Sequence, residues 1–107
     1  MIITTTSSVE GKKIKDYKGI VFGEVILGTH FMKDFSAGFR DLLGQRVSEY
    51  EDDLIAARER AISEMMERAD KLGANAIVGI KVDTEVINSM MMAVASGTAV
   101  FIEDMYE

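Results

Sequence analysis

His30 is the only imidazole in this chain of 107 residues, which contains no cysteine. The absence of thiols excludes disulfides, zinc fingers, iron–sulfur clusters and cysteine nucleophiles together. An imidazole can bind a divalent metal ion or act as a general base, so His30 is the candidate metal ligand. The simpler interpretation is a histidine at the end of a strand that caps a backbone group or faces solvent.

Carboxylates are the second source of chemistry in the sequence. Glu24 lies in one predicted strand and Asp83 and Glu85 in another, where they could meet across adjacent strands as a hydrolytic acid–base pair. Together with His30, such carboxylates would offer hard ligands that favour manganese, zinc or nickel. Residues 49–53 hold four more carboxylates, which suit the positive end of a helix dipole and lack the spacing of a calcium loop.

Three consecutive methionines, Met90 to Met92, carry the soft thioether ligands that suit Cu(I). Neighbouring side chains of a strand point to opposite faces, however, so the three cannot converge on one ion from a single chain. Packing in a core or a subunit interface explains them better. The serines and threonines have no Gly-x-Ser-x-Gly elbow, no partnering base and no phosphate-binding loop. We therefore expect no catalytic site.

A long amphipathic helix is the clearest element that the sequence predicts. Ser48 and Glu51 have the spacing of a capping box at its start, and Gly73 suits the position after its end. Its apolar face follows steps of three and four residues: Tyr50, Leu54, Ala57, Ala61, Met65, Ala69 and Leu72. A shorter helix is expected over residues 34–43, ended by Gly44.

The residues before these helices have the composition of strands. We expect a short strand at residues 2–3 and a turn at Glu10 and Gly11. Residues 12–18 are expected to form a loop or a short edge strand. Residues 19–29 predict a long bent strand, whose glycines mark bulges or close approaches of the backbone.

After Gly73 the hydrophobic period changes from 3.6 to 2. Residues 75–87 predict a strand with one apolar face: Ala76, Val78, Ile80, Val82, Thr84 and Val86. A turn at Asn88 and Ser89 leads into a second strand at residues 90–102, which completes a hairpin. The order of elements predicts an α+β fold of two layers, with the long helix packed on a mostly antiparallel sheet.

More apolar surface is expected than one chain can bury. The strand at residues 90–102 is apolar on both faces, yet a single long helix covers only one face of a sheet. The long helix also has a second apolar row, formed by Ile55, Ile62 and Met66. Since large exposed apolar patches are rare on monomers, the sequence predicts a homo-oligomer.

The charge and hydropathy of the chain exclude several classes of partner. The formal net charge of −6 argues against binding to the backbone of a nucleic acid. The most apolar window spans residues 90–102, well short of the roughly 20 residues that a membrane span needs. The first residues lack the basic and apolar regions of a signal peptide. We expect a cytoplasmic protein.

The chain resembles the YbjQ-like family of small proteins, whose label names heavy-metal binding, over roughly residues 1–102. The residues that carry the resemblance are Thr4-Thr5-Thr6, Gly23-Glu24, Tyr50-Glu51, Leu54, Ala57-Arg58, Ala61, Met65, the run from Gly73 to Gly79, Asp83, Glu85 and Ser96-Gly97-Thr98-Ala99-Val100. The length alone predicts one domain over residues 1–107. The resemblance implies a dodecin-like subunit and a closed homopentamer in which short strands join neighbours.

These considerations predict a cytoplasmic homo-oligomeric binding or scaffold protein without catalytic activity, which holds a small ligand or metal ion at subunit junctions or in a central channel. Three alternatives stay open. One is a protein that binds a divalent metal through His30 and carboxylates. Another is a hydrolytic enzyme with carboxylates at a subunit interface. The third is a protein–protein adaptor that uses an acidic helix face including Glu59 and Glu67.

Overall fold

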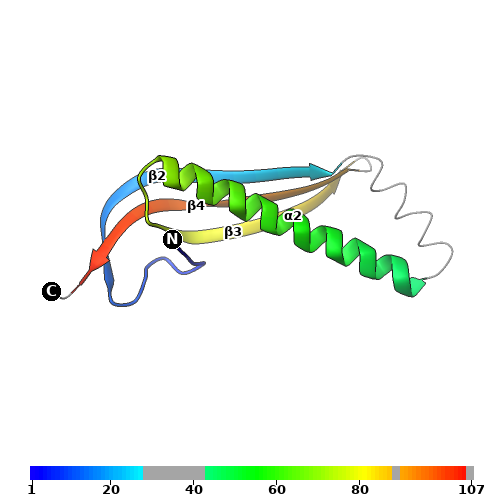
Figure 1. The fold of residues 1–107 in the computed structure, drawn as a ribbon, viewed down its shortest axis with the longest axis horizontal. Coiled ribbons are helices and arrows are strands. Elements are labelled where there is room, and N and C mark those ends of the chain that lie inside the picture. The colour runs from blue at the N-terminus through cyan, green and yellow to red at the C-terminus, as the bar shows by residue number, and fades with distance from the viewer. Residues whose placement is uncertain (28–42, 88–89, 106–107) are drawn as a thin grey trace.

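The computed structural model describes residues 1–27, 43–87 and 90–105, which form one helix on a four-stranded sheet (Figure 1). The elements are β1 (Ile2–Ile3), β2 (Lys12–Leu27), α2 (Leu43–Lys71), β3 (Ala76–Ile87) and β4 (Met90–Asp104). The strand order is β1-β3-β4-β2; β1 pairs with β3 in parallel, and the other pairs are antiparallel. The predicted α+β class and the hairpin of β3 and β4 are confirmed, although the turn at Asn88 and Ser89 lies outside the described residues.

α2 packs on one face of the sheet, mainly over β2 (Figure 1). Its buried row consists of Ala57, Ala61, Met65 and Ala69, which confirms the middle of the predicted apolar face. Leu72, at the predicted end of that face, is 46% exposed. The small alanines let the helix approach so closely that a Cβ on Gly23 would lie 1.7 Å from the carbonyl oxygen of Ala61. The predicted close approach at a glycine of this strand is therefore confirmed.

The start of α2 differs from the prediction. The helix begins at Leu43, so Gly44 and Ser48 lie inside it and no acidic residue occupies its first turn. The capping box expected at Ser48 and the end of the shorter helix expected at Gly44 are both wrong. Residues on both sides of Ser48 are compatible with a helix, and a cap residue does not by itself stop one. The shorter helix expected at residues 34–43 lies outside the described residues except for Leu43.

The end of α2 follows the prediction. Gly73 has a φ of 83°, the left-handed conformation that glycine adopts without steric cost. The amide of Gly73 donates to the carbonyl of Asp70 at 3.0 Å, and the amide of Ala74 donates to that of Ala69 at 3.1 Å. This is the Schellman pattern, which satisfies carbonyls at a helix end.

β2 is longer than predicted, because residues 12–18 belong to the strand instead of forming a separate segment. Its pairing with β4 shifts register between Ile14 and Asp16 and again between Tyr17 and Gly19. Gly19 has a φ of 124°, so a glycine marks one of these irregularities, as expected.

β3 changes face part-way along its length. Its pairing with β4 shifts between Val78 and Lys81, where Gly79 has a φ of 62°. Ala76 and Val78 therefore pack on the helix-free side of the sheet, whereas Ile80 and Val82 pack on the helix side. The prediction of one continuous apolar face is wrong, since an extra residue in a bulge reverses the alternation that follows it.

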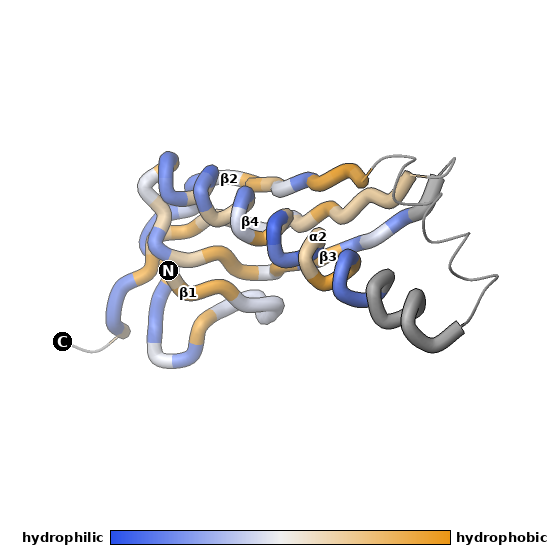
Figure 2. The backbone as a smooth tube through the Cα atoms, turned by 45° about the vertical axis from the view of Figure 1, so that its right-hand side comes forward, coloured by the Kyte–Doolittle hydropathy of each residue, from blue (hydrophilic) through white to orange (hydrophobic). Residues whose placement is uncertain are grey.

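The buried side chains form two clusters on opposite faces of the sheet. The cluster between α2 and the sheet includes Val21, Val25, Met65, Ile77, Ala93 and Ala95. The other comprises Ala76, Val78, Val100 and Ile102, with Val9 and Ile14 packed against it. The N-terminal segment, residues 1–11, lies beside the β3 edge of the sheet (Figure 2) and contributes Val9 to this second cluster. The amides of Gly79 and Ile80 donate to the carbonyls of Thr6 and Thr4.

We predict that Gly23→Ala destabilises the fold more than Gly97→Ala does. The added methyl at Gly23 meets backbone atoms of the helix, whereas the one at Gly97 meets mainly the side chains of Ile77 and Ile80, which can move. The expected losses of unfolding free energy are about 3 kcal/mol or more at Gly23 and about 1–2 kcal/mol at Gly97. Urea unfolding measures both, and equal or reversed losses would contradict the close helix–strand contact.

Candidate functional site

The helix-free side of the sheet carries an exposed apolar surface along β2. Ile20, Phe22 and Ile26 are 71%, 47% and 60% exposed, whereas Val21 and Val25, which point to the helix, are buried. Tyr17 pairs with Val100 of the helix-free cluster and is 68% exposed. We call the open face the set Tyr17, Ile20, Phe22, Ile26, Met92 and Val94, the last two being half-buried residues of β4.

The open face is large for a chain of this size. Since a large apolar or aromatic side chain presents about 150–200 Å², the four exposed residues of β2 leave roughly 400–500 Å² accessible. That is comparable to the largest apolar patch on a typical monomer, which is often functional. The doubly apolar strand at residues 90–102 is confirmed, because Met91, Ala93 and Ala95 are buried under the helix while Met92 and Val94 belong to the open face.

Charged residues border the open face on the side of β3, where Lys81, Asp83 and Glu85 are exposed. Glu24 and Asp83 are each opposite Val94, one from either side, so β4 separates the two carboxylates. Two strand spacings amount to about 10 Å. The expected meeting of Glu24 with Asp83 or Glu85 across adjacent strands is therefore wrong, because β2 and β3 are not neighbours.

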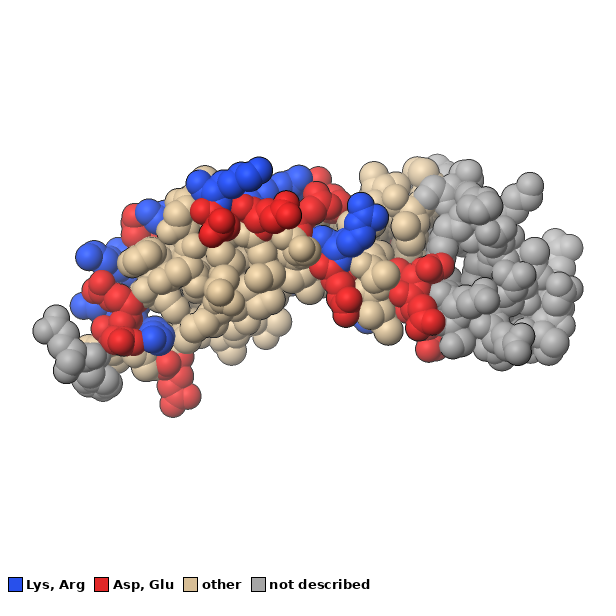
Figure 3. Space-filling model, viewed as in Figure 1, with Lys and Arg blue, Asp and Glu red and all other residues tan. Residues whose placement is uncertain are grey.

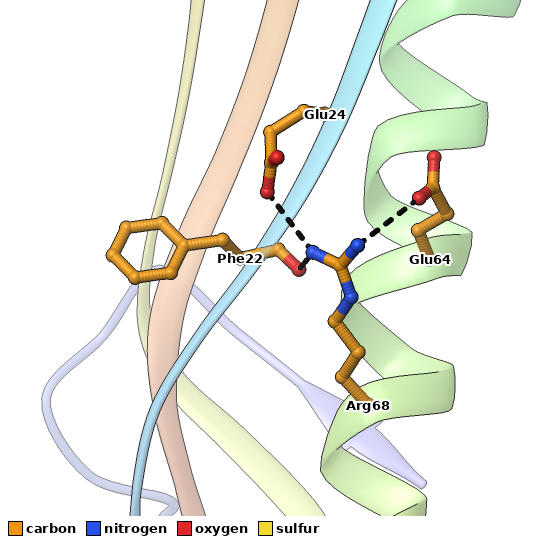
Figure 4. Close-up of polar contacts among 4 residues, drawn as sticks. All are labelled: Phe22, Glu24, Glu64 and Arg68. Atoms are coloured by element: carbon orange, nitrogen blue, oxygen red, sulfur yellow. Dashed lines mark hydrogen bonds and ion pairs between the residues drawn. The ribbon is translucent and has the colours of Figure 1, made fainter.

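Arg68 of α2 binds Glu24 at the outer edge of β2 (Figure 4). Its Nη1 donates to the carbonyl oxygen of Phe22 at 2.7 Å and to Oε1 of Glu24 at 2.9 Å, and its Nη2 lies 3.5 Å from Oε1 of Glu64. The contact with Glu64 has the i,i+4 spacing of neighbours on a helix, whereas the other two join residues far apart in the chain. Glu24 thus joins β2 to α2 through its ion pair with Arg68, and one of its carboxylate oxygens is engaged in that contact.

The remaining candidates are dispersed. His30 lies outside the described residues, and among those described no group of three His, Cys, Asp or Glu side chains is placed to hold a metal ion. Glu51, Asp52 and Asp53 are exposed within the helix, beyond its first turn. Met65 and Met91 are fully buried, which confirms packing as the role of these two methionines.

The lysines of residues 12–18 are offset by carboxylates. Lys12 pairs with Asp104, and Lys13 and Lys15 lie 3.3 and 3.6 Å from Glu103. Lys and Arg lie beside Asp and Glu where the described surface in view is charged (Figure 3). This mixture lacks the clustered positive charge that a phosphate backbone requires.

A pocket of about 470 Å³ opens beside the N-terminal segment. It is lined by Ile2, Thr4, Thr6, Ser8, Val9 and Glu10. The hydroxyl of Thr6 donates to the carbonyl of Ser8 at 2.6 Å. The hydroxyl oxygens of Thr6 and Thr4 lie 2.8 Å apart. The threonine hydroxyls are therefore engaged in shaping the segment.

Comparison with known proteins identifies the family. A family model described as "Putative heavy-metal-binding", YbjQ, matches residues 1–103. The chain belongs to this family. A UPF0145 protein of Clostridium botulinum (strain Alaska E43 / Type E3) is 57% identical over 106 residues, covering 96% of this chain and 100% of that protein. A UPF0145 protein of Listeria ivanovii is also 57% identical, with 96% of each chain covered.

The fold of this chain is also seen in a solved structure. A crystal structure of a protein of unknown function from Pediococcus pentosaceus ATCC 25745, assigned to the DUF74 family, has a TM-score of 0.59 to this chain at 21% identity. The likeness covers 96% of this chain and 98% of that one. The family predicted from the residues is confirmed by the family model and by the two relatives. Within the described part of the chain, no helix is long and apolar enough to cross a bilayer.

We predict that Val25→Ala and Ile26→Ala, which are neighbours on β2, act through different contacts. Val25 is 5% exposed under the helix, so its truncation should cost about 2 kcal/mol at any protein concentration. Ile26 is 60% exposed, so its truncation should cost less than about 1 kcal/mol in dilute protein. Urea unfolding over a range of protein concentrations measures both. A large, concentration-independent loss at Ile26 would contradict the assignment of these side chains to opposite faces.

Proposed function

We propose that this YbjQ-family protein is a cytoplasmic, homo-oligomeric binding or scaffold protein without catalytic activity, built from one domain over residues 1–107. The observation that carries the proposal is the open face, which leaves large apolar side chains of β2 exposed while α2 covers the opposite side. A sheet that is apolar on both faces needs a layer on each. A second copy of the chain would supply the missing layer.

The area of the open face is consistent with a subunit contact. Burial of roughly 400–500 Å² of apolar surface contributes a favourable hydrophobic free energy of about 10 kcal/mol. The loss of translational and rotational freedom on association opposes it by about 4–15 kcal/mol. A standard interface buries about 800 Å² per partner, so the open face would form the apolar centre of a wider contact. Its charged border at Lys81, Asp83 and Glu85 is of the kind found at the rim of such interfaces.

A closed ring, a pentamer of dodecin-like subunits, is the assembly that we infer from the family resemblance. The subunit is elongated, with extents of 61 × 22 × 16 Å, and its two faces differ, which favours contacts between unlike surfaces. Unlike surfaces that meet repeatedly generate a ring when the rotation closes. A small ligand or metal ion would then bind at subunit junctions or in the central channel.

Native mass spectrometry of protein purified without chelator tests the assembly. We expect a species of five times 11.8 kDa. Ile20→Lys places a charge on the open face and should yield smaller species, because an unpaired charge buried in a contact is costly. Ser7→Lys, a matched charge in the exposed N-terminal segment, should leave the pentamer intact. A monomer of the unaltered chain at micromolar concentration would refute the proposal.

Metal binding is the second candidate, favoured by the description of the family model. His30 would be the ligand, joined by carboxylates or by its copies in the ring. Elemental analysis after titration with Zn²⁺, Ni²⁺ or Mn²⁺ should show stoichiometric metal that His30→Ala abolishes. Equal uptake by both proteins would exclude His30, and no uptake by the unaltered chain would exclude this function. Glu24 is the carboxylate to consider beside His30 in this test. A metal ion that binds Glu24 would compete with Arg68 for its carboxylate.

A further inference from the structure

The outer edge of β2 is a long unpaired strand edge in the described sheet. β2 has 16 residues and stands at the end of the order β1-β3-β4-β2. An unpaired edge presents backbone N–H and C=O groups that another extended chain can bind, which is the usual route to edge-to-edge aggregation. The two halves of this edge differ in what opposes such pairing.

The first half, residues 12–19, is irregular and rich in lysine, although carboxylates pair with these lysines. It contains both register shifts of β2 and the lysines Lys12, Lys13, Lys15 and Lys18. Bulges and lysines on an edge strand are established devices against pairing with another strand. This half is therefore unfavourable to strand addition by its own sequence.

The second half, residues 20–27, has neither device. Its pairing with β4 is unbroken from Ile20 to Leu27, and its sequence IVFGEVIL has one charged residue, Glu24, and no proline. Short segments of high β-propensity and low charge are the ones that assemble into stacked sheets. On composition and regularity alone, this half should recruit further copies of the chain.

Arg68 lies at the middle of this second half (Figure 4). Its Nη1 donates to the carbonyl oxygen of Phe22 at 2.7 Å, and Glu24 and Glu64 hold the guanidinium from the strand and from the helix. Arg68 reaches the edge because α2 approaches β2 so closely at Gly23. It thus occupies a backbone acceptor and places a cation where an added strand would lie.

We propose that the β2 edge over residues 20–27 is a latent self-association surface for a second copy of this chain, and that Arg68 closes it. The proposal concerns the edge of the sheet and is independent of a ring assembled through the open face. Loss of the Arg68 side chain should convert a stable protein into one that assembles through β2 while it stays folded. An exposed ion pair contributes little to stability, so the fold itself should tolerate the change.

The experiment compares the full-length variants Arg68→Ala and Arg60→Ala, which remove the same charge from the same helix. Light scattering and thioflavin T fluorescence are followed well below the unfolding temperature. We expect several-fold faster assembly for Arg68→Ala than for Arg60→Ala, with similar unfolding midpoints. Assembly of the Arg68 variant no faster than that of the Arg60 variant would overturn the proposal.

Two double variants separate edge protection from a general loss of stability. Arg68→Ala with Glu24→Lys restores a cation to the edge strand, whereas Arg68→Ala with Glu59→Lys adds the same charge on an exposed helix position. Both double variants contain Arg68→Ala, so both have whatever decrease in stability that substitution causes. We expect only the Glu24→Lys double variant to return to the rate of the unaltered protein. Equal rates for the two double variants would overturn the proposal.

Discussion

The close contact of α2 with β2 at Gly23 is the constraint on which the rest of the structure depends. The backbone of the helix approaches the strand more closely than any side chain at position 23 would allow. The alanines of the helix and of β4 permit the same closeness along the layer, since they add little between the two backbones. A thin helical layer of this kind packs firmly but covers little area, and it lies mainly over β2.

This narrow coverage explains both polar and apolar features of β2. Because the helix lies near the edge strand, Arg68 can reach the carbonyl of Phe22 and the carboxylate of Glu24. Because the helix covers one side only, the other side of the same strand exposes Tyr17, Ile20 and Ile26. The strand is therefore anchored to the helix near its outer edge, while large apolar side chains on its helix-free side stay exposed.

The sequence predicts local features well and long-range pairings poorly. The buried row of α2 and the turn at Gly73 follow from periodicity and from the conformational freedom of glycine, which are properties of neighbouring residues. The start of the helix at Leu43 was missed, because the cap signal at Ser48 competes with residues that also favour a helix. The contact of Arg68 with Glu24 was missed because it depends on which strand lies beneath the helix.

The strand order accounts for another wrong expectation. The sequence shows that Glu24 lies in one strand and that Asp83 and Glu85 lie in another. That β4 lies between these two strands is a property of the sheet topology. The open face could be anticipated as surplus apolar surface, since residues 90–102 have no polar side. That most of its exposed area lies on β2 follows from the position of the N-terminal segment and of the helix, which the sequence does not encode locally.

The bulge at Gly79 changes the alternation by which β3 contributes to the two clusters. Ala76 and Val78, before it, pack in the cluster that Val9 adjoins, whereas Ile80 and Val82, after it, pack on the helix side together with Ile77. The hydrogen bonds from Gly79 and Ile80 to Thr6 and Thr4 attach that segment at the changeover point. Separation of the N-terminal segment from β3 would therefore expose the second cluster and leave the packing of the helix on the sheet intact.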